Sequence, residues 1–157
     1  MNGGVSMKNL FDPMVANEVK TRLGKLGPQS ERQWGKMSPP QMLAHCSVSM
    51  QWAVGEVVPE KVALPMRLMG RLVKPMVFRN EDPLRKNSPT AKSLIVADDR
   101  DLGKERERLS GLIDKFAAGG AAGCTKNPHS FFGKMTPGEW AILMYKHLDH
   151  HLRQFGV

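Results

Sequence analysis

The sequence predicts an all-α protein of a single domain, and three observations support this. The chain of 157 residues has a typical length for one domain. Its 11 methionines, 15 glycines and single tyrosine differ from the aromatic and β-branched composition of a strand-rich protein. Four segments combine a helix-start pattern with apolar residues three and four positions apart. We therefore expect one helical domain over residues 1–157, with residues 1–10 flexible.

Each of the four segments begins at a residue that caps helices well. Ser38 and Thr136 each precede a proline, and Gln41 and Glu139 follow three positions after them, which is the pattern of a capping box. Asp12 also precedes a proline, and the third segment begins near an aspartate. We expect helices over residues 12–26, 38–55, 101–120 and from 136 nearly to the C-terminus.

The connections between these segments are harder to predict. Residues 62–69 and 72–78 have helical patterns, but Pro65, Gly70 and Pro75 interrupt them, so we expect a broken helical connection with a basic face. Residues 93–96 suit a short extended piece. Residues 117–123 have the composition of a flexible linker.

The charge and cysteine content narrow the class of protein. The net charge is +8, and residues 67–92 carry seven basic side chains against two acidic ones. Two cysteines are too few for a disulfide scaffold, so we expect a reduced, cytoplasmic protein. No apolar run approaches the roughly 18 residues of a membrane helix, and we expect no membrane partner. The basic stretch has one aromatic residue, so nucleic acid is a less favoured partner than solvent.

Three histidines are the candidate chemical site. His147 and His151 lie four residues apart on one face of the last helix, and His45 lies on the apolar side of the second helix. Two imidazoles at this spacing can bind one divalent metal ion, and a third from a facing helix makes a three-ligand site. The alternative is that these histidines are neutral core residues, each with one hydrogen-bond partner.

Four neighbouring residues have weaker predictions. Gln154 lies on the same face as the two histidines and suits either a hydrogen bond to one of them or plain packing. Cys46 follows His45 and is expected to be a buried, inert thiol. Asp149 points away from the histidine face, so it is either a surface charge or paired. His129 is expected to be an exposed loop residue.

The motif at residues 147–155, together with a lone His45 on an earlier helix, resembles the DinB/YfiT-like superfamily of metalloenzymes, in a branch of unknown function. Residues 34–45, 127–133 and 136–140 are also similar to that branch. The resemblance implies a four-helix up-down-down-up bundle with a long irregular crossover connection. It also implies that His45, His147 and His151 are ligands of a nickel or zinc ion. Members of the superfamily include transferases and isomerases that use low-molecular-weight thiols.

These observations lead to three hypotheses of different classes. The first is a metal-dependent transferase or hydrolase, in which the ion activates a thiol or a water molecule for attack on a small-molecule substrate. The second is a non-enzymatic basic helical module that binds nucleic acid or an acidic partner, with structural histidines. The third is a stress-induced metal-binding or dimer-forming scaffold without chemistry, since the methionine content leaves room for an apolar homodimer interface.

Overall fold

The protein is all-α over the residues that the structure, a computed structural model, describes, which are residues 7–157. Within that range there is no β-strand, only an isolated bridge between His129 and Gly133. No helix in the described part of the chain is both long and apolar enough to cross a membrane. The elements in chain order are α1 (Pro13–Gly24), α2 (Pro39–Ala53), α3 (Leu64–Val77), the 3₁₀ helix η1 (Lys92–Leu94), α4 (Leu102–Gly123) and α5 (Pro137–Gln154).

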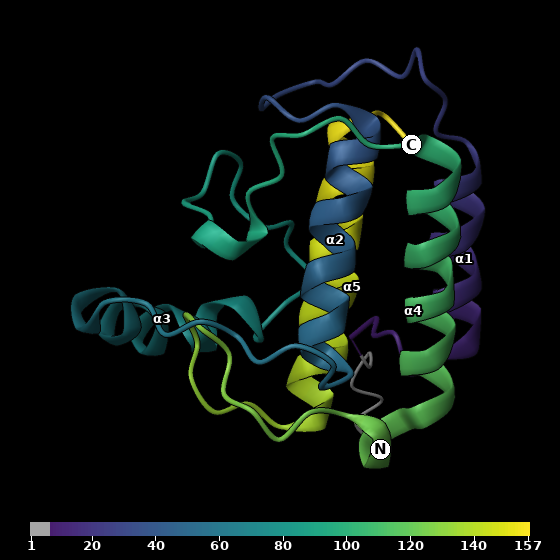
Figure 1. The fold of residues 1–157 in the computed structure, drawn as a ribbon. Helices are drawn as coiled ribbons and strands as arrows, with labels where there is room; N and C mark the ends of the chain where they lie inside the picture. The colour runs from purple at the N-terminus through teal and green to yellow at the C-terminus, as the bar shows by residue number, and fades with distance from the viewer. Residues whose placement is uncertain (1–6) are drawn as a thin grey trace.

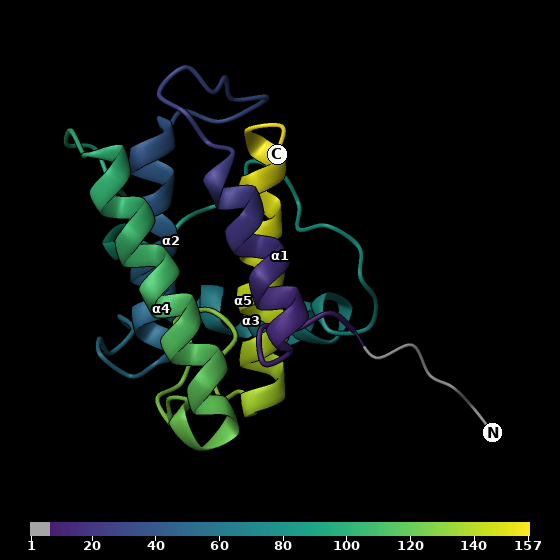
Figure 2. The same cartoon turned by 90° about the vertical axis from the view of Figure 1, so that its right-hand side faces the viewer.

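Helices α1 and α5 lie side by side and run in the same direction. The backbone N–H of Leu10, just before α1, donates to the carbonyl of Ala141 in the first turns of α5. At the other end, the Arg22 guanidinium donates to the carbonyl of Val157, beyond the end of α5. The N-terminal ends of the two helices therefore meet, and so do their C-terminal ends (Figure 2).

Helices α2 and α4 form a second parallel pair. The Gln41 side-chain amide in the first turn of α2 donates to the carbonyl of Asp98, shortly before α4. The N–H of Thr125, just after α4, donates to the carbonyl of Ala53 at the end of α2. Helix α2 also lies against α5 (Figure 1), and the three predicted histidines are on these two helices.

The predicted helix starts are confirmed. Both capping boxes form, with Ser38 paired to Gln41 and Thr136 paired to Glu139. Asp12 accepts a hydrogen bond from the N–H of Met14 at the start of α1. Because these caps satisfy N–H groups that have no partner inside the helix, they determine the first residue of each helix and the direction its later side chains take.

The core is enclosed by α1, α2, α4 and α5, and Trp52, Trp140 and Phe116 are its largest fully buried side chains. Leu10 is fully buried as well. This end of the stretch predicted to be flexible is therefore packed into the core, and residues 1–6 lie outside the described residues.

The prediction of a broken connection over residues 62–78 is wrong, because α3 is one continuous helix. Pro65 lies in its first turn, where a missing N–H costs no hydrogen bond. Pro75 lies near the other end, so only a short remainder of the helix follows it. Gly70 is buried where α3 contacts the loop that contains Phe131, and a side chain there would collide with the Phe131 carbonyl. The glycine that suggests a break is required for packing.

Two further connections differ from expectation. The predicted extended piece over residues 93–96 is wrong for its first half, because residues 92–94 form η1 and extended backbone angles begin at Ile95. The predicted linker over residues 117–123 is helical except at Gly120, whose φ of 53° and ψ of −151° interrupt α4. A glycine adopts such a conformation at little cost, so the chain kinks there and resumes a short helical turn.

Candidate metal centre

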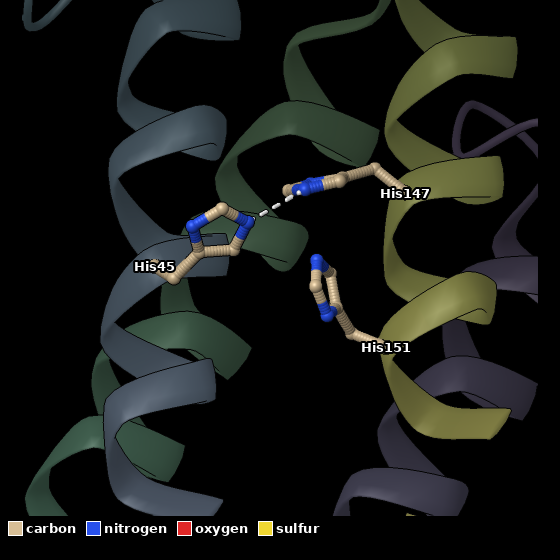
Figure 3. Close-up of side chains that lie close together, drawn as sticks. All are labelled: His45, His147 and His151. Carbon is tan, nitrogen blue, oxygen red and sulfur yellow. Dashed lines mark hydrogen bonds between the residues drawn. The ribbon is translucent and has the colours of Figure 1, made fainter. Parts of the chain in front are cut away.

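The three predicted histidines meet between α2 and α5. His45 extends from α2, and His147 and His151 extend from successive turns of α5, so that the three rings point toward one another (Figure 3). One nitrogen from each ring lies within 4.8 Å of the others. The three side chains are therefore close enough to bind one metal ion.

His45 is held by the crossover connection. Its Nδ1 lies 2.8 Å from the carbonyl oxygen of Leu94, at the end of η1. A carbonyl oxygen can only accept, so Nδ1 carries the proton and donates. The lone pair of a neutral ring is then on Nε2, which faces the other two histidines.

His151 is held by Gln154, one turn later on α5. The Gln154 amide nitrogen donates to the carbonyl of Trp34 at 2.7 Å, so the amide oxygen must face the other way. That oxygen lies 2.7 Å from Nδ1 of His151 and accepts its proton. Gly35 makes room for this arrangement, since a side chain there would collide with the Gln154 amide nitrogen. Gln154 therefore makes the hydrogen bond that the sequence left as one of two alternatives.

His147 completes the group in a different way. Its Nε2 lies 2.9 Å from Nε2 of His45. Because the His45 nitrogen already has the lone pair, the His147 nitrogen donates the proton between them. For His147 to bind a metal through Nε2, this proton has to move to Nδ1 or leave. As a whole residue His147 is half-buried, whereas His45 and His151 are buried.

Burial holds all three rings in the neutral form. It is the largest cause that lowers the pKa of His45 and His147, and it lowers the pKa of His151 to about 3. The rings also disfavour each other's charged forms, because two imidazolium ions at this separation repel. Neutral imidazole is the form that binds a metal ion, so the residues present suit one.

The two other predictions on the helices that carry the site have clear outcomes. Cys46 is buried against the Met42 sulfur, which confirms that the thiol is buried, and burial raises the pKa of this thiol far above the usual range. Asp149 is paired rather than a free surface charge. It is buried and accepts hydrogen bonds from Arg22 and Arg153, both at 2.8 Å.

The prediction that His129 is an exposed loop residue is wrong. Its ring packs edge-on against Trp52 and Trp140, with centroids 5.7 Å and 5.4 Å away. Its Nδ1 accepts the backbone N–H groups of Phe131 and Phe132 and so organises the loop on which α3 rests. Burial lowers its pKa to about 4. The residue as a whole is half-buried. Nothing in the local sequence indicates this packing, because it results from the loop folding against two helices.

Sequence reasoning also missed two residues that flank the predicted ligands. The ammonium group of Lys146 donates to the carbonyls of Val77 and Asn80, both at 2.7 Å. Nδ1 of His150 lies 3.2 Å from the carbonyl of Leu84 and donates to it. Together with His45, these side chains attach the crossover between α3 and α4 to the site. The signal that could have indicated Lys146 was the presence of a lysine in a stretch of mainly apolar residues on α5.

Fold and site together define an all-helical protein with a candidate three-histidine metal centre. The sequence model of a family described as a protein of unknown function (DUF1569) matches residues 12–156, and the chain belongs to this family. Comparisons with curated proteins and with solved structures give no match.

Proposed function

We propose that the protein is a metal-dependent enzyme of the DinB-like type, with His45, His147 and His151 as the ligands of a divalent ion, nickel or zinc. In this proposal α1, α2, α4 and α5 form an up-down-down-up bundle, and the long crossover closes one side of the site. The observation that carries the proposal is the convergence of three neutral imidazoles from two helices.

The donor set supports a catalytic rather than a purely structural ion. Imidazole nitrogen suits zinc and nickel, and structural zinc sites normally have four protein ligands. Among the described residues, His45, His147 and His151 are the group of possible ligands that lie close enough together to bind an ion. Three protein ligands leave a fourth coordination position for another molecule. A divalent ion there would lower the pKa of a bound thiol or water toward neutral pH, so that a nucleophile could form.

The hydrogen bonds of the chain itself prepare the site. Leu94 and Gln154 accept the outward protons of His45 and His151, which selects the tautomers that leave Nε2 free. His147 has the ring that must change its proton position, and its residue as a whole is half-buried where His45 and His151 are buried. We therefore propose that a small-molecule substrate approaches on the His147 side.

The nucleophile in this proposal comes from outside the chain. Both cysteines are free and buried, and burial raises the pKa of each thiol. Neither is a good thiolate source at neutral pH. This favours an external low-molecular-weight thiol, as in a thiol transferase, or water, as in a hydrolase. Two free thiols also suit a reducing compartment, and we place the protein in the cytoplasm.

Metal content tests the proposal directly. We expect elemental analysis of protein purified without chelator, or reconstituted afterwards, to find about one first-row divalent ion per chain. His147→Ala and His151→Ala should each lose most of it with unchanged helix content. His150→Ala is the matched control, because it removes a neighbouring imidazole that points to Leu84, and it should retain the metal.

A protein without stoichiometric metal in either preparation would overturn the proposal. If metal is present, electrophilic test compounds offered with a set of low-molecular-weight thiols, and ester substrates offered without them, distinguish transferase from hydrolase. Turnover that survives His151→Ala would show that the activity arises elsewhere.

A further inference from the structure

Helix α3 is attached to the rest of the protein along one edge. Gly70 rests on the carbonyl of Phe131. One turn later, the Lys74 ammonium donates to the carbonyl of Lys134 at 2.8 Å and pairs with Glu139 at 2.9 Å. The rest of α3 projects away from the other helices (Figure 1).

The opposite face of α3 is apolar and exposed. At about 100° per residue, five large side chains fall within an arc of about 140° whose centre is opposite Gly70. Between 51% and 77% of each is exposed to solvent. The five residues are Leu64, Leu68, Met69, Leu72 and Met76. This is the reverse of an ordinary surface helix, whose apolar face is covered by the core.

Basic side chains border this apolar face. Arg67 and Arg71 lie one turn apart along its edge, both are exposed, and α3 contains no acidic residue. Among the described residues, neither arginine has an ion-pair partner. A partner for this face must therefore cover apolar side chains and also supply negative charge beside them.

We propose that the exposed face of α3 docks onto an anionic lipid surface. A helix with this pattern lies in the plane of the membrane, its apolar face among the acyl chains and its arginines at the anionic headgroups. Its 14 residues span about 21 Å. This contact requires no spanning segment, so the run-length argument that predicts no membrane partner does not apply to it.

Other occupants fit the same face less well. A second copy would cover the apolar side chains, but it would bring a second pair of unpaired arginines to the interface and no acidic residue from α3 to meet them. A nucleic acid would meet the charge but leave the leucines and methionines exposed. The combination of apolar area and basic edge matches the chemistry of an anionic bilayer.

Co-sedimentation of the full chain with lipid vesicles tests this proposal. The probes are vesicles of phosphatidylcholine alone and of phosphatidylcholine with about a third phosphatidylglycerol. We expect binding to the anionic vesicles at least tenfold stronger than to the neutral ones, and weaker as salt is raised. No preference for the anionic vesicles would overturn the proposal.

Two paired substitutions separate the apolar and the charged contributions. Leu68→Gln with Leu72→Gln should weaken binding at least tenfold, and Arg67→Gln with Arg71→Gln should do so only on anionic vesicles. Met14→Gln is the matched control, because Met14 is 82% exposed on α1 and should not matter. All these side chains are exposed, so circular dichroism and the melting temperature should stay unchanged.

Two results would contradict the proposal even if the protein binds vesicles. If the leucine variant binds as tightly as the unmodified chain, the attraction is charge alone and the apolar face has another occupant. If light scattering shows a dimer that the leucine variant dissociates, a second copy covers the face.

Discussion

The interface between α2 and α5 and the outer face of α3 have opposite relations to water. The interface encloses three imidazoles, with His45 and His151 buried and His147 half-buried. The outer face of α3 exposes five large apolar side chains. Either arrangement costs stability if left alone, because buried polar groups lose water and exposed apolar groups remain in it.

The difference lies in how each cost is offset within the chain. Inside the interface the imidazoles have partners: His45 donates to the carbonyl of Leu94, and His151 donates to the side-chain oxygen of Gln154. The outer face of α3 has no comparable partner among the described residues. The polar groups of the interface therefore find their partners within the chain, and these partners orient the imidazole nitrogens. The face of α3 is complete only with something from outside the chain.

The largest expected effect is a loss of folding stability in acid, caused by protonation of His129. His129 has a pKa of about 4 in the folded protein against an ordinary value of 6.5, so between these values the unfolded chain binds more protons. Its contribution to stability is therefore fully present above pH 6.5 and is lost as pH falls toward 4. At about 1.4 kcal/mol per pKa unit, this one ring contributes up to about 3 kcal/mol.

Urea unfolding of the metal-free protein at several pH values measures this effect. His129→Gln removes the titrating ring while keeping an acceptor for the N–H groups of Phe131 and Phe132. We expect the variant to show a shallower loss of stability between pH 6.5 and 4. An equal slope in both proteins would mean that His129 is not held neutral by burial.

A second prediction concerns the attachment of α3. Gly70→Ala would place a methyl group against the Phe131 carbonyl, so the helix must move off the loop. Overpacking of this kind costs about 1–3 kcal/mol, and we expect faster proteolysis within residues 60–92. Gly111→Ala on α4 is the matched control, because no atom lies near its added methyl group and alanine favours a helix. Equal cleavage of both variants would show that the Gly70 contact does not hold α3.

The smallest expected effect concerns the hydrogen bond between Gln154 and His151. Gln154→Met keeps the side-chain length but removes the oxygen that accepts the His151 proton. Loss of such a partner typically weakens metal binding 10- to 100-fold, and titration with zinc or nickel should show this with unchanged helix content. Gln29→Ala, at an exposed loop position, serves as the control. Unchanged affinity would mean that Gln154 only packs.

Some features of the molecule could be predicted because they depend on local chemistry. The helix starts at Ser38 and Thr136 follow from side chains that satisfy nearby backbone N–H groups. Once a start is known, the helical repeat gives the direction of every later side chain, which is why His45, His147 and His151 could be grouped. The positions of Pro65 and Gly70 within one continuous helix could not be predicted this way. A proline near a helix start and a glycine at a packing contact have the same residue types as a helix break.

The helical class, the helix starts and the inward direction of the three histidines could be predicted without coordinates, because each depends on residues within a few turns of one another. Which ring nitrogen of each histidine is free depends on the folded arrangement, since the carbonyl of Leu94 and the carbonyl of Trp34 that orients the Gln154 amide come from distant segments. The tertiary structure also packs His129 against two tryptophans and leaves the apolar side of α3 exposed. These outcomes depend on which surfaces meet, and a periodic pattern shows that a face is apolar without showing what covers it.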